Sequence, residues 1–261
     1  MPGNYEVVLL AGGSAAEAAL ILDVGAPTKA LLPISGRPMF HYVADAWQRA
    51  GCMQRLIVVG LPAVGTPAPE VDCEVVYLSD QGSAVAKMLV ALEATRPGGM
   101  VVLSSADIPL LTPRAIVHFL ETCEACGASL CYPIVERSVM EAQFPGSGRT
   151  FRHTLDGDYC GGDLFALAPE MAQANLPLLQ ALSAGRKSAL ALAHAVGPGV
   201  VLRLLTRRLR LSGLERRFSA ILDAPCKAII SPYAEIAMDV DKPHHFEVVS
   251  RALAADERRA S

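Results

Sequence analysis

Aromatic residues and positive charge are both scarce in this chain of 261 residues. Phe, Trp and Tyr make up 5% of the sequence while 52% is hydrophobic, so we expect an aliphatic core, as in a parallel sheet covered by helices. The formal net charge of -3 argues against a nucleic-acid substrate. The length suits one large α/β domain that spans residues 1–261.

The N-terminal residues lack the basic and apolar regions of a signal peptide, which predicts a cytoplasmic protein. Cysteines are present in an odd number, seven, which favours free thiols in a reducing compartment over a disulfide framework. Cys123 and Cys126 form the only Cys-x-x-Cys. Because no second pair accompanies it, we interpret it as part of a helix rather than as a zinc site.

Apolar runs alternate with helical patterns along the chain, which predicts an α/β fold with a mostly parallel sheet, right-handed crossovers and helices on both faces. The expected strands are residues 6–10, 56–60, 74–78, 101–105, 129–133, 160–166 and 226–230. The expected helices are residues 39–50, 83–95, 113–126, 169–174 and 243–253, and residues 61–71 are expected to form a loop.

The end of the first expected strand is the most informative segment. Its apolar run leads into Ala11-Gly12-Gly13-Ser14, and Lys29 follows in the next loop. Glycines let backbone N–H groups approach a polyphosphate closely, and the lysine supplies a mobile positive charge. The segment predicts a site for a nucleoside triphosphate. It is neither a Walker loop, which needs Gly-Lys-Ser/Thr, nor a dinucleotide fingerprint, which needs a third glycine leading into a helix.

Carboxylates follow two further segments. Asp107 comes just after the expected strand 101–105, where α/β sheets bind ligands. Asp239 and Asp241 precede the last expected helix. Oxygen ligands together with substrate phosphates are what Mg²⁺ prefers, so Asp107 could complete a Mg²⁺ site with Asp239 or Asp241. Two structural roles stay open: Asp107 as a turn residue before a proline, and Asp241 as the N-cap of the helix.

Five segments together resemble the MobA-like nucleotidyltransferase (NTP transferase) family. This family is similar to molybdenum cofactor guanylyl- and cytidylyltransferases, sugar-phosphate nucleotidyltransferases and methylerythritol phosphate cytidylyltransferase. The segments, in the family's order, are residues 10–13, 29–34 with 36–39, 81–83, 106–109 and 239–243. The resemblance implies a Rossmann-like sheet of the nucleotide-diphospho-sugar transferase fold.

The resemblance also implies an activity, which is the Mg²⁺-dependent transfer of a nucleoside monophosphate from a nucleoside triphosphate to a small phosphorylated acceptor, with release of pyrophosphate. Lys29 and Asp107 would be the catalytic residues, and Asp107 would carry Mg²⁺ with Asp239 or Asp241. The implied nucleotide-binding residues are Leu10, Ala11, Gly12, Gly13, Lys29, Gln81, Gly82 and Ser83. Weaker candidates for acceptor binding are Arg149, Arg152, Gly161, Gly162 and Asp163, although a plain surface loop explains their composition equally well.

The first loop departs from the family's pattern, which usually reads Gly-x-Gly-x-x-Arg soon after the first strand. Here the corresponding segment, residues 14–26, is long and partly acidic and contains no arginine. The usual second basic contact to the phosphates is therefore missing. An alternative is therefore a nucleotide-binding protein that has lost catalysis. A molybdopterin-type cofactor and methylerythritol phosphate remain alternative acceptors.

An arginine-rich, largely helical block at residues 178–223 interrupts the alternation of strands and helices and is expected to be an insertion. Three interpretations compete for it: a helical cap over the acceptor, the surface of a homodimer or other oligomer, and a basic face that rests on a membrane. Its apolar part contains His194, Pro198 and Arg203, which argues against a transmembrane span.

Overall fold

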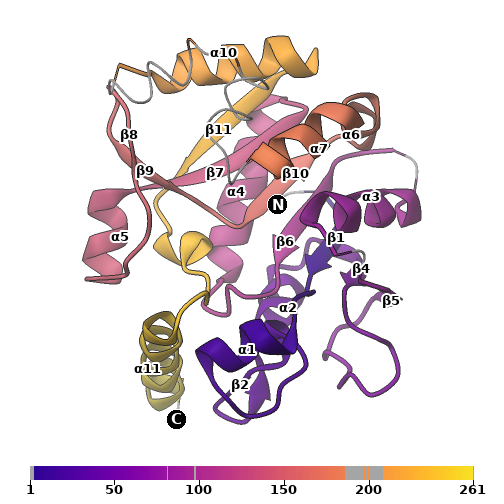
Figure 1. Cartoon of the computed structure of the whole chain (residues 1–261), viewed down its shortest axis with the longest axis vertical. Helices are drawn as coiled ribbons and strands as arrows, with labels where there is room; N and C mark the ends of the chain where they lie inside the picture. The colour runs from indigo at the N-terminus through magenta and orange to yellow at the C-terminus, as the bar shows by residue number, and fades with distance from the viewer. Residues whose placement is uncertain are drawn as a thin grey trace.

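A central nine-stranded sheet forms the middle layer of the computed structural model, which describes residues 3–80, 82–96, 98–185, 197, 199 and 208–260 (Figure 1). The strand order is β5-β4-β1-β6-β10-β7-β9-β8, and β11 pairs with β7. The strands are β1 Tyr5–Leu10, β4 Met53–Val59, β5 Glu74–Leu78, β6 Val101–Ser105, β7 Leu130–Glu136, β8 Arg152–His153, β9 Asp158–Gly161, β10 Leu164–Leu167 and β11 Cys226–Ser231. A separate ribbon pairs β2, Pro33–Ile34, with β3, Arg37–Pro38.

The sheet is mostly parallel, as expected. β1 pairs in parallel with both β4 and β6, β4 with β5, and β7 with β11. β10 lies antiparallel between β6 and β7, which therefore point the same way. The carboxyl ends of β1, β4, β5 and β6 consequently meet at one edge of the sheet, together with the amino end of β10. This is the edge at which α/β sheets bind ligands.

Helices cover both faces of the sheet. One apolar cluster buries Trp47 of α2 and Phe119 of α4 against one face, and the other buries Ala91 of α3 and Met171 of α6 against the opposite face. The helices are α1 Ala15–Ile21, α2 Met39–Ala50, α3 Ala84–Ala94, α4 Pro113–Cys126, α5 Arg137–Gln143, α6 Pro169–Ala174, α7 Leu176–Gly185, α10 Leu211–Leu222 and α11 Pro243–Ala260. The aliphatic, two-sided core predicted from composition is therefore confirmed.

Two expectations about local structure are wrong. Residues 15–21 form α1 rather than a loop, because Ser14 and Glu17 make a capping box that satisfies the first free N–H groups. The single strand expected at 160–166 is two strands, β9 and β10, which both pair antiparallel with β7 and are separated by an irregularity at Gly162 and Asp163. There the Gly162 N–H donates to the Pro133 carbonyl at 2.9 Å and the Asp163 N–H to the Ile236 carbonyl at 2.9 Å. The break places Asp163 at the ligand-binding edge.

The expected helical insertion at 178–223 falls partly on residues outside the described ranges, namely 186–196, 198 and 200–207. Its described ends are parts of α7 and α10. These ends are tied to the body of the protein, since the Asn175 amide donates a hydrogen bond to the Leu222 carbonyl at 2.9 Å. Among the described residues, no helix combines the length and apolar character needed to cross a membrane. All seven cysteines are free thiols, as predicted.

Candidate active site

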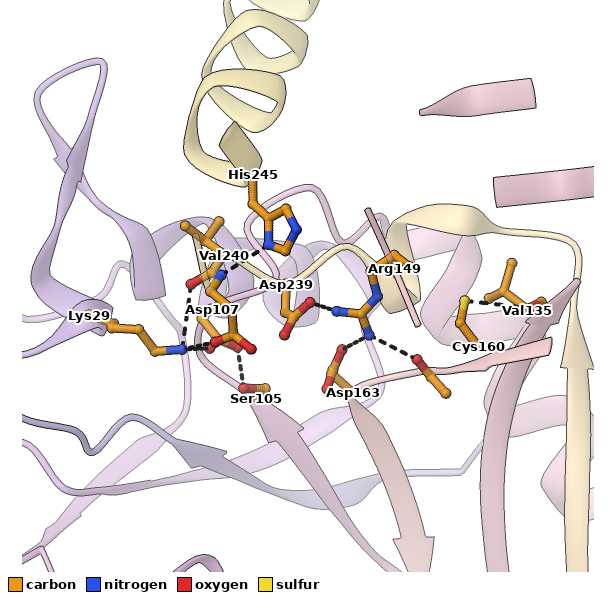
Figure 2. A network of polar contacts seen from close by, with 12 residues as sticks. Lys29, Ser105, Asp107, Val135, Arg149, Cys160, Asp163, Asp239, Val240 and His245 are labelled. Atoms are coloured by element: carbon orange, nitrogen blue, oxygen red, sulfur yellow. Dashed lines mark hydrogen bonds and ion pairs between the residues drawn. The ribbon is translucent and has the colours of Figure 1, made fainter. Parts of the chain in front are cut away.

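The Lys29 ammonium joins two of the predicted carboxylates. It donates to the Asp107 carboxylate at 2.7 Å and to the Val240 carbonyl at 3.4 Å, and it also contacts the Asp241 carboxylate (Figure 2). Lys29 opens a short 3₁₀ turn, Lys29–Leu31, whereas Asp107 follows β6 and Asp241 precedes α11. Residues far apart in the sequence therefore meet at the edge of the sheet, where Asp107 was expected from its position after the strand 101–105.

The charges in this group stabilise one another. Burial would lower the pKa of Lys29, but the charge of Asp107 and hydrogen bonds to Asp107 and Asp241 raise it above its ordinary value. Burial would likewise raise the pKa of Asp241, yet the hydrogen bond and charge of Lys29 outweigh burial and lower it. Ser105 adds a hydroxyl that donates to the other oxygen of Asp107. Lys29 and Asp241 consequently remain ionised at neutral pH.

Arg149 organises a second, adjacent group. Its guanidinium pairs with Asp239, lies 3.6 Å from the Asp163 carboxylate and donates to the Gly161 carbonyl at 3.2 Å (Figure 2). Arg149 and Asp239 are well buried, with side chains that are 15% and 11% exposed. Neighbouring aspartates near the C-terminus thus have different partners, since Asp241 contacts Lys29 and Asp239 contacts Arg149.

Backbone hydrogen bonds hold the two groups together. The Val240 N–H donates to the Asp107 carbonyl at 2.9 Å, which fixes the segment between Asp239 and Asp241 against the end of β6. The Ser105 N–H donates to the Asp163 carbonyl, also at 2.9 Å. Four carboxylates and two cations therefore share one region, with an excess of two negative charges.

His245, on the first turn of α11, closes one side of the region. Its Nδ1 accepts a hydrogen bond from the Asp241 N–H at 3.2 Å, and the residue is only 3% exposed. Burial, followed by the nearby positive charge of His244 and Arg149, lowers the pKa of His245 to about 4. At neutral pH the imidazole is therefore a neutral acceptor that positions the Asp241 backbone.

The glycine loop lies at the same edge, where β1 ends. The Ala11 N–H donates to the Val59 carbonyl at 2.8 Å, and the Leu10 carbonyl accepts from the Ala106 N–H at 3.2 Å. A Cβ on Gly60 would stand 2.4 Å from the Cα of Gly12, so the loops after β1 and β4 pack backbone against backbone. Gly12 and Gly60 hence permit close packing of the two loops, and the approach of a polyphosphate to the glycine loop stays a prediction.

The remaining described residues predicted to bind the nucleotide or the acceptor lie outside the two groups of Lys29 and Arg149. Ser83 caps α3, since its hydroxyl accepts from the Ala86 N–H at 3.1 Å, and the Gly82 N–H donates to Asp80 at 2.7 Å. Gln81 lies outside the described residues. Gly162 lies at the break between β9 and β10. Arg152 is exposed on β8, apart from the Arg149 group.

Sequence reasoning missed three polar residues at this edge: Ser105, Asp80 and Lys87. Ser105 had a signal, because it ends β6 two residues before Asp107. Lys87 lies in the expected helix 83–95, where it is 8% exposed and pairs with Asp80 at 3.2 Å beside Gly12. A lysine among the apolar residues of a predicted core helix was the available signal.

The mostly parallel sheet, with a glycine loop, a lysine and several carboxylates at its carboxyl edge, has the α/β nucleotidyltransferase fold. Comparison with known proteins narrows this class. Residues 7–195 match the MobA-like NTP transferase domain, and the chain belongs to this family. The resemblance inferred from the five segments is confirmed.

Individual relatives match this chain over different lengths. A hypothetical transferase from Thermus thermophilus is 35% identical, with a TM-score of 0.81 over 93% of this chain and 99% of its own. A 3-deoxy-manno-octulosonate cytidylyltransferase from Haemophilus ducreyi is 29% identical over 121 residues, which are 45% of this chain and 48% of the relative. This chain thus matches about half the length of that curated relative. A 2-C-methyl-D-erythritol 4-phosphate cytidylyltransferase, also from Thermus thermophilus and 15% identical over 97% of this chain and 99% of its own, shares the fold with a TM-score of 0.55.

Proposed function

We propose that the protein is a Mg²⁺-dependent nucleotidyltransferase that transfers a nucleoside monophosphate from a nucleoside triphosphate to a small phosphorylated acceptor and releases pyrophosphate. The observation that carries the proposal is the meeting of Asp107 and Asp241 on the Lys29 ammonium, beside a glycine loop at the carboxyl edge of the sheet. Membership of the MobA-like NTP transferase family supports it.

In the proposed reaction, an oxygen of the acceptor phosphate forms a bond to the α-phosphorus of the donor. The bond between the α-phosphorus and the oxygen that it shares with the β-phosphorus breaks, and pyrophosphate leaves with that oxygen and the electron pair of the bond. The acceptor phosphate is already ionised, so the reaction needs no general base. The protein's task is to align the two substrates and to stabilise the charge that grows on the phosphoryl oxygens, and Lys29 is placed to do this.

Asp107 and Asp241 are the residues that would hold Mg²⁺. Both carboxylates already converge on one cation, and Mg²⁺ is typically bound by one or two carboxylates together with substrate phosphates. In the described part of the chain, no three His, Cys, Asp or Glu side chains form a group that could hold a metal ion by themselves. When bound, Mg²⁺ would neutralise phosphate oxygens. Asp239, predicted as an alternative ligand, is paired with Arg149 instead.

The substrates can be narrowed within this proposal. Cytidylyltransferases among the relatives make CTP the first donor to test. Arg149, Gly161 and Asp163 border the Asp239 side of the site, from which we expect the acceptor to approach. The free cysteines support a reducing, cytoplasmic setting.

The test is a calorimetric titration of each common nucleoside triphosphate with Mg²⁺ into the wild type and Asp107→Asn. We expect one triphosphate to bind selectively, and about tenfold or more weakly to the variant because it loses an ionised ligand. Asp45→Asn is the matched control, because Asp45 lies on α2 and pairs with the exposed Arg49 at 3.7 Å. Pyrophosphate release is then measured with phosphorylated acceptors. No binding of any triphosphate to the folded wild type would overturn the proposal.

A further inference from the structure

Lys87 on α3 lies directly against the glycine loop, and the proposed reaction gives it no role. A Cβ built on Gly12 would stand 2.0 Å from the Lys87 Nζ, so the ammonium occupies the space that the missing side chain leaves. The residue is 8% exposed. A positive charge is thereby fixed at the loop that we propose to bind the donor's phosphates.

This position is unfavourable for a lysine in two respects. A buried ammonium loses hydration, which costs free energy unless the charge is paired. The Lys87 N–H donates to the Ser83 carbonyl at 3.0 Å, which places Lys87 in the first turn of α3, and the positive end of the helix dipole repels a cation there. Residues that break such local rules are typical of functional sites.

The partner of Lys87 is the carboxylate of Asp80, which follows β5. One Asp80 oxygen lies 3.2 Å from the Lys87 Nζ and accepts the Gly82 N–H at 2.7 Å, and the other would stand 2.6 Å from a Cβ on Gly12. Burial would raise the pKa of Asp80, but the N–H of Gly82, the charge of Lys87 and the N–H of Gly13 lower it. An anion therefore sits over the glycine loop, held by backbone N–H groups and an ammonium.

We infer that Lys87, with the N–H groups of Gly13 and Gly82, forms a pocket for phosphate groups of the donor nucleotide, and that Asp80 holds their place until the nucleotide displaces it. The inference rests on the proposed function. Backbone N–H groups next to a lysine are a typical phosphate-binding arrangement. The Asp80 side chain is 36% exposed and can turn into solvent, whereas Lys87 is buried on a helix and stays. Lys87 thus supplies the second basic contact that the arginine-free first loop lacks.

Calorimetric titrations of Lys87→Met with inorganic tripolyphosphate and with the preferred nucleoside triphosphate, both with Mg²⁺, test the pocket. We expect binding of both to weaken about 10- to 100-fold, as for the loss of one charged hydrogen bond. Lys227→Met is the matched control, because Lys227 lies on β11 and pairs there with Glu215 of α10 at 3.0 Å. This variant should bind both compounds like the wild type. Equal binding by Lys87→Met and the wild type would overturn the inference.

Asp80→Asn tests the place-holding role independently of Lys87. Asparagine keeps a hydrogen-bond acceptor but removes the competing negative charge, so tripolyphosphate should bind about threefold tighter or more. Weaker binding would mean that Asp80 positions Lys87, which contradicts displacement. If the wild type binds tripolyphosphate through Lys87 but binds no nucleoside triphosphate, the pocket stands and the proposed function fails. If the wild type binds neither compound, both are overturned.

Discussion

Replacing Arg149 by methionine should destabilise the protein far more than removing an ordinary surface arginine. The Arg149 side chain is 15% exposed and pairs with Asp239, whose side chain is 11% exposed, so the substitution would leave a buried carboxylate without its cation. Breaking a buried ion pair from one side typically costs about 3–5 kcal/mol. The hydrogen bond to the Gly161 carbonyl, about 1 kcal/mol, is lost as well. We expect a loss of roughly 4 kcal/mol in the free energy of unfolding.

The assay is urea denaturation followed by circular dichroism at neutral pH. Arg137→Met is the control, because Arg137 pairs with Asp158 at 3.1 Å with side chains 45% and 32% exposed, and such pairs contribute about 1 kcal/mol or less. The double variant Arg149→Met/Asp239→Asn should be more stable than the sum of the single losses predicts, by about 2 kcal/mol, since it no longer buries a lone charge. A loss no larger than that of Arg137→Met, or strictly additive losses, would refute the reasoning.

Further predictions concern the glycine loop and His245. Gly60→Ala should lower the free energy of unfolding by more than about 2 kcal/mol, because φ is +106° there and the new Cβ would meet the Gly12 backbone at 2.4 Å. Gly12→Ala should fold normally but bind triphosphate weakly, because its new Cβ would displace the ends of the Lys87 and Asp80 side chains. Thermal melts and calorimetry separate the two variants, and equal stability of both would contradict the backbone packing. Burial lowers the pKa of His245 from 6.5 to about 4, so the unfolded state binds its proton first and metal-free protein should lose about 1–2 kcal/mol between pH 7 and pH 5. Urea titrations at both pH values should show a smaller loss in His245→Gln, and an unchanged loss would exclude His245 as the cause.

Much of the fold follows from patterns within single segments. The strands at 74–78 and 101–105 and the helices at 39–50 and 113–126 have the predicted bounds, because apolar patterns determine them locally and a left-handed glycine ends both helices. α1 was missed although Ser14 and Glu17 carry the capping-box signature. The break between β9 and β10 had no local signal strong enough, since it depends on carbonyls of Pro133 and Ile236 from other segments.

The candidate site likewise has features that the sequence predicts and features that depend on contacts between distant segments. Asp107 could be joined with Asp239 or Asp241 from the sequence, because carboxylates suit Mg²⁺, and the family resemblance added Lys29 to the site. Which aspartate contacts Lys29 could not be predicted, since it depends on where Arg149 lies. Lys87 was missed because helical periodicity describes a face of a helix but not the loop packed against it.

The charges of the site explain why so many carboxylates can remain together without a metal. Lys29 bridges two of them, and Arg149 contacts the other two, so each carboxylate has a cation nearby. The two groups still carry a net excess of negative charge, which opposes an incoming polyphosphate. A nucleotide that enters with Mg²⁺ would reverse this opposition, because the metal adds two positive charges where Asp107 and Asp241 converge. Our proposals therefore assign a task to each cation of the site: Lys29 bridges Asp107 and Asp241 and stabilises charge on the phosphoryl oxygens, Arg149 holds Asp239, and Lys87 receives the donor's phosphates.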